Sequence, residues 1–336
     1  MKLMRAIQIK SPGDDFELIQ KEIPEPKDNE VLIKVEACGI CHGDAIAKEG
    51  HMPGIKYPII PGHEIVGTVD KTGKDVTSWK TGQRVGVGWH GGHCFQCHAC
   101  RSGNFGACEK SLTTGLHIDG GYAEYMIARP EVIVNIPEEL TSVNAAPILC
   151  AGRTTFGALK DSNAKGGDLV AIHGLGGLGH LAVQYAVKMG FKTVVLSRGK
   201  EKESLAYSLG AHFYIDNAAS DGAKELTRLG GARVILCTAP DIKAISGLIP
   251  GLGRNGQAII ITGASDMLQV PTSMMLGGQR SVRGYVSGSI EEAINFSILT
   301  KVTPMVEVFP LEKAAEAFEK MMTAKVHFRA VLKMAY

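Results

Sequence analysis

The sequence predicts an α/β protein with a β-rich N-terminal half and a doubly wound parallel sheet in its second half. Short strand-like segments separated by Gly and Pro dominate the first half, and strand and helix patterns alternate after about residue 152. Such alternation is typical of a parallel sheet. Because 336 residues exceed one ordinary domain, we expect more than one. We place the first domain at residues 1–151 and the second at 152–286, with 287–336 returning to the first.

In the N-terminal half, strand signals occur at residues 31–38, 64–71 and 83–89. Turn-forming pairs such as Pro53-Gly54 and Pro61-Gly62 separate these segments. Helical periodicity is weak here, so this half is expected to be largely β.

The second half opens with the buried-type strand DLVAIHG at residues 168–174. An amphipathic helix follows, and Gly190 is expected to end it. The apolar residues on one face of this helix are Leu178, Leu181, Ala182, Tyr185, Ala186 and Met189. Further strand signals lie at 193–196, 212–216, 233–237 and 258–263, and the tail ends in the strand HFRAVLKM.

Composition and charge exclude several classes of protein. The formal net charge is only +2, so no basic excess indicates nucleic acid. We see no apolar run long enough for a membrane span and no signal peptide. A cytoplasmic protein without nucleic-acid or membrane partners is expected.

Four of the eight cysteines, Cys94, Cys97, Cys100 and Cys108, lie within 15 residues. In a reducing compartment this spacing indicates one tetrahedral Zn²⁺ with four thiolate ligands. Such a closed site would hold together a lobe at about residues 90–110 and do no chemistry. Free thiols or a redox cluster are the alternatives. The neighbouring His90, His93 and His98 are expected to be polar surface residues.

A glycine-rich motif, Gly174-Leu-Gly176-Gly177-Leu178-Gly179, connects the first strand of the second half to its helix. In this context GxGxxG is the dinucleotide-binding fingerprint of Rossmann folds. The glycines allow a tight turn, close approach of the pyrophosphate and close helix packing. The alternative is a glycine-rich turn without a ligand.

The end of the next strand indicates which dinucleotide binds. NAD-binding proteins usually place Asp or Glu there, about 20 residues after the glycine motif. This chain has Ser197 and Arg198 instead, which suit the 2′-phosphate of NADP. We therefore expect NADP(H), with NAD(H) less favoured. The alternative is that Arg198 and Lys200 are solvated loop charges.

Three further motifs complete a pattern: CGICHGD at residues 38–44, PGHE at 61–64 and APILCAGRTT at 146–155. Together with the four cysteines and the glycine motif, they resemble the zinc-dependent alcohol dehydrogenases of the medium-chain dehydrogenase/reductase superfamily. The resemblance is closest to the cinnamyl-alcohol-dehydrogenase-like and NADP-dependent microbial branches.

The resemblance implies a GroES-like catalytic domain, a Rossmann domain and an active site in the cleft between them. It also implies a catalytic zinc, in addition to the structural one, held by Cys41, His63 and Cys150 with an open fourth position. Glu64 resembles a carboxylate that can occupy this position, and Asp44 resembles the acid that orients the ligand histidine.

Other roles follow from the same resemblance. They are an aromatic wall of the substrate pocket at Trp89, nicotinamide contacts at Thr154 and Leu178, and pyrophosphate contacts at His42 and Arg329; each residue could instead serve packing or lie at the surface. The family self-associates, so a homodimer or homotetramer is expected, with the segment 281–288 at the interface. Cys38 and Cys237 are expected to be buried thiols without ligand roles.

The resemblance implies reversible oxidation of a primary or secondary alcohol, run as NADPH-dependent aldehyde reduction. One alternative is a related zinc dehydrogenase acting on a polyol, a sugar or a formaldehyde adduct. An alternative of another class is a non-enzymatic zinc protein in which the nucleotide acts as a sensor.

One motif departs from the family. Ser or Thr usually stands two residues after the first zinc ligand and relays the alcohol proton, but this chain has Gly43. A later relay histidine is replaced by Ile46. The proton would then move through water or another group such as His51. If the backbone tolerates a Cβ, Gly43→Thr is expected to raise the oxidation rate.

Overall fold

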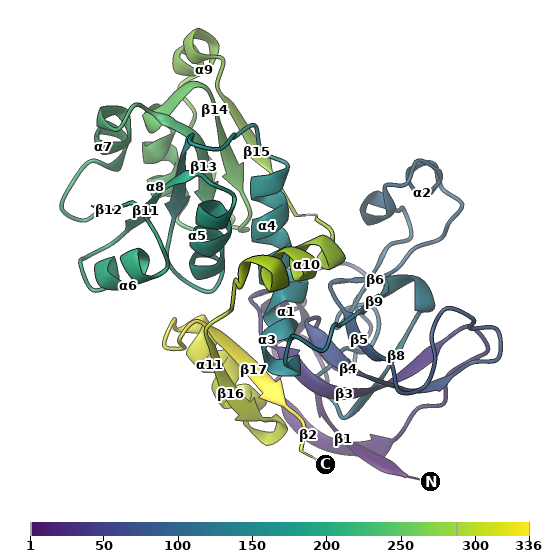
Figure 1. Cartoon of the computed structure of the whole chain (residues 1–336). Helices are drawn as coiled ribbons and strands as arrows, with labels where there is room; N and C mark the ends of the chain where they lie inside the picture. The colour runs from purple at the N-terminus through teal and green to yellow at the C-terminus, as the bar shows by residue number, and fades with distance from the viewer. Residues whose placement is uncertain (1, 287, 336) are drawn as a thin grey trace. The chain divides into compact units, whose positions relative to one another are not determined.

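The computed structural model describes residues 2–286 and 288–335 (Figure 1). It contains two compact units, which we call unit 1 (Met1–Cys150 and Pro304–Tyr336) and unit 2 (Ala151–Thr303). The sequence placed the return to the first domain at residue 287. In the structure, helix α10 (Ile290–Thr300) packs against α4 (Arg153–Lys160) and therefore belongs to unit 2.

Unit 1 is built on a seven-stranded sheet, counted over the described residues, with the path β16-β17-β3-β4-β5-β9 and with β8 also paired to β3. These strands are β3 (Val31–Gly39), β4 (Ile65–Thr72), β5 (Arg84–Val87), β8 (Tyr125–Ala128), β9 (Ile133–Asn135), β16 (Val306–Pro310) and β17 (Arg329–Lys333). Two smaller antiparallel pairs are β1 (Leu3–Gln8) with β2 (Glu17–Glu22), and β6 (His90–Gly92) with β7 (Leu112–Thr113). The late strand β17 thus lies between β16 and β3 (Figure 1).

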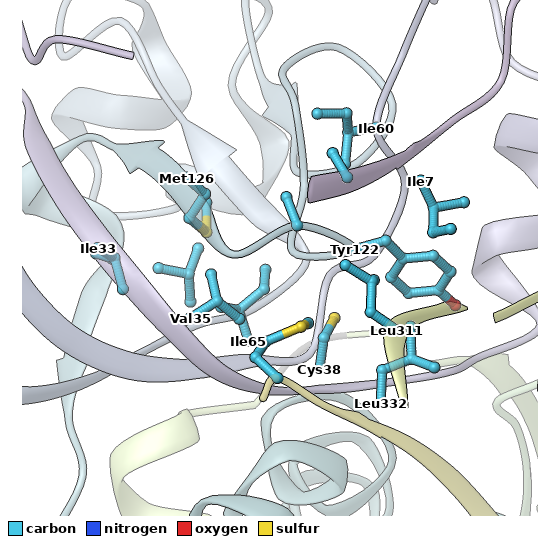
Figure 2. Close-up of a cluster of buried hydrophobic side chains, with 14 of the residues drawn as sticks. Ile7, Ile33, Val35, Cys38, Ile60, Ile65, Tyr122, Met126, Leu311 and Leu332 are labelled. Atoms are coloured by element: carbon cyan, nitrogen blue, oxygen red, sulfur yellow. The ribbon is translucent and has the colours of Figure 1, made fainter. Parts of the chain in front are cut away.

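The core of unit 1 forms against this sheet (Figure 2). Ile33, Val35 and Ile65 of β3 and β4 contribute side chains that are fully buried. Leu311 and Leu332 come from the C-terminal segment and join the same cluster. Burial of β-branched and aliphatic side chains from both chain segments is what attaches residues 304–336 to unit 1.

The helices of unit 1 are short. They are α1 (Gly43–Glu49), α2 (His98–Arg101), α3 (Ser142–Pro147) and α11 (Ala314–Met322), with 3₁₀ turns η1 (Phe105–Ala107), η2 (Pro130–Val132) and η5 (Leu311–Lys313). The weak helical periodicity did not predict α1, which has only seven residues and starts at a glycine.

Unit 2 contains a six-stranded parallel sheet, within the described residues, of order β12-β11-β10-β13-β14-β15. The strands are β10 (Leu169–His173), β11 (Lys192–Ser197), β12 (Phe213–Asp216), β13 (Ala232–Cys237), β14 (Leu252–Ile260) and β15 (Ser281–Gly284). The other helices are α5 (Gly179–Lys188), α6 (Glu203–Ser208), α7 (Gly222–Arg228), α8 (Ile242–Leu248), α9 (Thr272–Gly278) and the 3₁₀ turn η4 (Ile249–Gly251). The π-helix η3 (Ile148–Gly152) spans the boundary between the units.

The predicted α/β fold with a doubly wound parallel sheet is confirmed. The strand order reverses between β10 and β13, which is the switch point where such sheets bind ligands at their carboxyl edge. Gly190 follows α5 with a φ of +80°, as a residue that ends a helix does. In the described residues, no helix is long and apolar enough to span a membrane. Segment 281–288 contains β15, while its Ser287 lies outside the described residues.

Candidate metal centres and dinucleotide site

Four potential metal ligands from distant parts of the sequence meet in unit 1. Cys41 lies between β3 and α1, His63 and Glu64 directly precede β4, and Cys150 follows α3. The ligand atoms of these residues all lie within 4.8 Å of one another, and the two Sγ atoms are 3.9 Å apart. We call these four residues the open cluster. Three of them are ligands of the kind that hold catalytic zinc, a site in which one coordination position stays open.

The imidazole of His63 is oriented by a buried carboxylate. His63 is completely buried, and its Nδ1 lies 3.0 Å from Oδ1 of Asp44. Oδ2 of Asp44 accepts hydrogen bonds from the backbone N–H of Cys41 and from the hydroxyl of Tyr122. Nε2 of His63 has no hydrogen-bond partner in the described residues. A neutral imidazole that donates through Nδ1 presents the Nε2 lone pair, which is the arrangement of a metal ligand.

The carboxylate of Glu64 pairs with a cation from the C-terminal segment. Nη2 of Arg329 on β17 lies 2.5 Å from Oε1 of Glu64 and donates a second hydrogen bond to the carbonyl of Ile40. Burial raises the pKa of Glu64 to about 7, against the opposing effect of the Arg329 charge. The other oxygen of Glu64, Oε2, has no partner. The structure therefore brings Arg329, expected at the pyrophosphate, to the open cluster.

The donor set of the open cluster fits zinc. Two thiolates, one imidazole and one carboxylate are the ligands that Zn²⁺ takes in proteins. The hydrogen bond from Cys150, together with the nearby His63, holds the pKa of Cys41 well below its usual value despite burial. Nε2 of His63 and Oε2 of Glu64 are both buried without hydrogen-bond partners in the described residues. A metal ion bound by the open cluster would give the imidazole nitrogen the partner that it lacks.

Trp89 and Gly43 form one wall of the open cluster. The indole of Trp89 packs edge-on against the ring of His63, with centroids 4.8 Å apart. A Cβ built at Gly43 would lie 2.7 Å from Cζ3 of Trp89 and 2.8 Å from Cε1 of His63. Such distances are shorter than van der Waals contact. The expected gain from Gly43→Thr required room for a Cβ at position 43. This room is absent, because the indole of Trp89 and the imidazole of His63 fill that space.

The second cluster contains the four cysteines expected to hold structural zinc. The Sγ atoms of Cys94, Cys97, Cys100 and Cys108 lie within 4.8 Å of one another. Backbone N–H groups surround the sulfurs: those of Gln96 and Cys97 donate to Cys94, and that of Lys110 donates to Cys108. The N–H groups of Gln96 and Cys97 lower the pKa of Cys94 to about 6. We call this segment the four-cysteine lobe, and its stabilised thiolate fits a metal ligand.

The expectation that His93 is a polar surface residue is wrong. His93 is buried and stacks at 4.2 Å on Phe105, while Phe95 contacts it at the same centroid distance. Two phenyl rings cover the imidazole, and burial lowers its pKa. His98 is exposed, as expected, and His90 is half-buried with Nε2 at 2.9 Å from Nδ1 of His93.

The glycine motif of unit 2 has the backbone that a dinucleotide loop requires. Gly174 has a φ of +95°, and a Cβ there would lie 2.8 Å from Cβ of Ala239. A Cβ at Gly179 would collide with the carbonyl of Gly174, whereas Gly176 faces open space. The hydroxyl of Thr238 donates to the carbonyls of His173 and Gly174 and so holds the turn. Gly177 and Leu178 complete the turn before α5.

The loop after β11 is fixed by the neighbouring strand β12. Asp216 accepts a hydrogen bond of 2.8 Å from the N–H of Gly199, and the hydroxyl of Tyr214 donates to the Gly199 carbonyl. Ser197 is half-buried at the strand end, and Arg198 is exposed. Backbone hydrogen bonds from Ala218 and Gly199 lower the pKa of Asp216. The loop thus presents the Arg198 side chain to solvent from a rigid backbone.

Two further expected site residues lie in different units. Thr154 is buried on α4 of unit 2, and His42 is exposed directly before α1 of unit 1. Cys38 and Cys237 are both buried in the hydrophobic cores, as expected.

Several contact residues had no sequence signal. Tyr122 lies far from Asp44 in the chain, and neither Thr238 nor the pair Tyr214 and Asp216 belongs to a motif. The one available clue was position, since Asp216 and Thr238 lie at the carboxyl ends of strands.

Comparison with known proteins places these features in a family. A family model described as "Alcohol dehydrogenase GroES-like domain" matches residues 27–138, and one described as "Zinc-binding dehydrogenase" matches residues 177–299. The alcohol dehydrogenase notN of Aspergillus sp. (strain MF297-2) is 45% identical over 312 residues, covering 92% of this chain and 91% of the relative. The chain belongs to the zinc-containing alcohol dehydrogenases of the medium-chain dehydrogenase/reductase superfamily. The protein is therefore an alcohol dehydrogenase with two candidate zinc sites.

Solved structures of the same family support this fold. Cinnamyl alcohol dehydrogenase SbCAD4 from Sorghum bicolor superposes with a TM-score of 0.87 at 28% identity, covering 99% of this chain and 98% of that one. The CAD from Helicobacter pylori, complexed with NADP(H), gives a TM-score of 0.83 at 27% identity and covers 98% of each chain. Unit 1 corresponds to the GroES-like domain and unit 2 to the Rossmann domain.

Proposed function

We propose that this alcohol dehydrogenase prefers NADP(H) and reduces aldehydes to primary alcohols, with secondary alcohols as further substrates. The observation that carries the cofactor preference is the end of β11, where Ser197 and Arg198 stand in place of a carboxylate. Asp216, the nearby acid, uses Oδ1 to accept the N–H groups of Gly199 and Ala218. Arg198 makes no ion pair within the described part of the chain, so its guanidinium is available for a 2′-phosphate. Relatives of this fold use both cofactors, since one structure at 25% identity is titled an NAD-dependent alcohol dehydrogenase.

We assign catalytic zinc binding to Cys41, His63 and Cys150, with Glu64 as an alternative ligand. Zinc bound there supplies a Lewis acid for the substrate oxygen, and the nicotinamide supplies or accepts the hydride. Asp44 keeps His63 in the tautomer that presents Nε2. Trp89 closes one side of the site, and Arg329 balances the charge of Glu64.

The cofactor preference is tested by exchanging the residues at the end of β11. In the variant Ser197→Asp/Arg198→Asp, carboxylates repel the 2′-phosphate and accept hydrogen bonds from a free ribose. Isothermal titration should show tighter NADP⁺ than NAD⁺ binding in the parent and the reverse in the variant. Lys200→Ala, a change of a neighbouring loop cation, should alter the ratio much less. An unchanged ratio in the double variant contradicts the assignment.

The substrate class is tested with NADPH consumption across aliphatic, allylic and aromatic aldehydes, with and without a chelator. A polyol- or sugar-selective profile would contradict the proposal.

Two further assignments concern the compartment and the oligomeric state. The eight cysteines are all free, which suits a reducing compartment and hence the cytoplasm. Homo-oligomer formation, with β15 at the interface, is measured by light scattering during size-exclusion chromatography.

A further inference from the structure

Glu36 is a carboxylate that joins two hydroxyl groups from separate segments of unit 1. It lies on β3 and is half-buried. Its Oε1 accepts a hydrogen bond of 2.6 Å from the hydroxyl of Thr68 on β4, and its Oε2 accepts one of 2.5 Å from Ser142, the first residue of α3. Hydrogen bonds to a carboxylate are shorter and stronger than those between neutral groups. Glu36 therefore links β3 both to β4 and to α3.

The backbone of β3 has a bulge at Glu36. Val35 pairs with Gly67 of β4. Ala37, two positions on, pairs with the adjacent Val66, so Glu36 is an extra residue opposite β4. A bulge changes the direction of the side chain that it carries, and bulges are common beside active sites. The side chain of Glu36 is thus placed by an irregularity of the strand that leads to the open cluster.

The hydroxyl of Ser142 is not needed to start α3. The N-cap of this helix is Thr141, whose side chain accepts from the N–H of Asn144. The hydroxyl of Ser142 instead donates to Glu36, and its oxygen accepts a hydrogen bond of 3.1 Å from Nη2 of Arg84 on β5. The same guanidinium donates to two backbone carbonyls of the loop before α3. Side chains of β3 and β5 therefore hold the start of α3.

The segments that Glu36 joins are the ones that carry the ligands of the open cluster. Cys41 follows β3, His63 precedes β4, and Cys150 follows α3. A backbone ladder also joins β3 to β4, but α3 is a helix and has no such ladder. It packs on β3, β4 and β17, and its buried residues are two alanines and a proline, which form no directional bonds through their side chains. The hydrogen bonds of Ser142 are directional and can fix the place of α3 on the sheet.

We propose that Glu36 is a positioning residue for the open cluster. Its hydrogen bonds to Thr68 and Ser142 hold α3 in one place on the sheet, and α3 runs directly into the π-helix that contains Cys150. The Sγ of Cys150 is thereby held 3.9 Å from the Sγ of Cys41. This inference rests on the zinc assignment of the proposed function, but not on the cofactor or the substrate.

The test measures zinc retention instead of turnover. Full-length proteins loaded with zinc are dialysed against increasing concentrations of a chelator, and the zinc left per chain is measured. Cys41→Ala identifies the zinc of the open cluster, since the four-cysteine lobe is unchanged in that variant. Glu36→Ala removes both acceptors, whereas Glu36→Gln keeps the shape of the side chain and its capacity for two hydrogen bonds. Melting temperatures of the zinc-free proteins report stability separately.

A matched pair of hydroxyl variants separates positioning from helix stability. Ser142→Ala removes the bond between α3 and Glu36, whereas Thr141→Ala removes the N-cap of the same helix one residue earlier. Loss of an N-cap or of a hydrogen bond lowers stability, so both variants should melt below the parent. Only Ser142→Ala should weaken zinc binding by the open cluster.

We expect Glu36→Ala to weaken zinc binding by the open cluster about tenfold, the lower end of what the loss of an outer hydrogen-bonding partner causes at metal sites. Glu36→Gln should recover most of this loss, and zinc in the four-cysteine lobe should be retained as in the parent. Parent-like retention in Glu36→Ala overturns the proposal, as does an equal loss of zinc in Ser142→Ala and Thr141→Ala. If Glu36→Ala does not fold, the comparison of the two hydroxyl variants decides alone.

The same measurement separates failure of this inference from failure of the proposed function. If the parent retains no more zinc than Cys41→Ala, the zinc assignment itself is wrong and both proposals fall. If the parent holds a zinc that depends on Cys41 and Glu36→Ala retains it equally well, only this inference fails.

Discussion

The two cysteine-containing clusters of unit 1 use similar ligands but are supported in different ways. In the four-cysteine lobe, backbone N–H groups of nearby residues surround the sulfurs, and all four ligands come from one short segment. In the open cluster, ligands from three distant segments are supported by side chains, including Asp44, Tyr122 and Arg329. The four-cysteine lobe is therefore organised by its own backbone and by the metal that we expect it to bind, whereas the open cluster is organised by side chains of the surrounding fold.

The largest expected effect is on activity. Cys41→Ala removes one of three ligands from a cluster that the surrounding fold positions, so turnover should fall by at least about 10³-fold. The melting temperature should stay near that of the parent, because an open site contributes little to stability. His63→Ala and Cys150→Ala should behave alike. Metal analysis should give one zinc per chain instead of two; retention of two zincs with full activity would refute the assignment.

The four-cysteine lobe should respond in the opposite way. Cys97→Ser weakens the closed site whose metal holds this segment together, so the melting temperature should fall by several degrees. Turnover per folded molecule should change little at low temperature. Ser102→Ala in the same lobe is the control, since within the described residues that hydroxyl donates only to the carbonyl of Ala99. A Cys97→Ser protein that melts like the parent would show that the lobe needs no metal.

A smaller effect tests whether side chains really support the open cluster. Asp44→Asn weakens the acceptor for His63, and loss of such a partner typically costs about 10–100-fold in metal affinity or activity. Tyr122→Phe removes only the hydrogen bond to Asp44, so the free energy of zinc binding should weaken by about 1 kcal/mol. Zinc affinity measured by competition with a chelator, together with kcat, checks both variants. Equal losses in the two variants would contradict this ranking.

The smallest effect concerns the wall beside His63. Gly43→Ser places a Cβ against Trp89 and His63, and overpacking of this kind costs about 1–3 kcal/mol. In the background of Trp89→Ala the same substitution should cost less, because the indole is gone. Urea unfolding of the four proteins gives the coupling free energy. If the losses in the free energy of unfolding are additive, residues 43 and 89 do not compete for this space.

Sequence patterns predicted the features that depend on local spacing. The four cysteines, the glycine motif and the alternating strands of unit 2 each lie in one short segment, and each appears in the structure. The contacts that complete the sites were not predictable in this way. Arg329 reaches Glu64 across 265 positions, and Trp89 excludes a side chain at position 43 only because the fold brings them together.

The burial of His93 illustrates the same limit at short range. From the sequence, a polar residue beside metal ligands is predicted to be exposed. In the folded lobe, however, Phe95 and Phe105 cover the imidazole of His93. Helix α1 was missed for a different reason, because seven residues are too few for a periodic pattern.

The position of β17 between β16 and β3 has a consequence for synthesis of the protein. All of unit 2 is translated between the two segments that make up unit 1. Unit 2 can therefore finish folding on the ribosome while the sheet of unit 1 still lacks two strands, since domains generally fold as units during translation. Arg329 is made with β17, so Glu64 gains its cation only near the end of translation. The cysteines of the open cluster can thus be synthesised and brought together before Arg329 is present to balance the charge of Glu64.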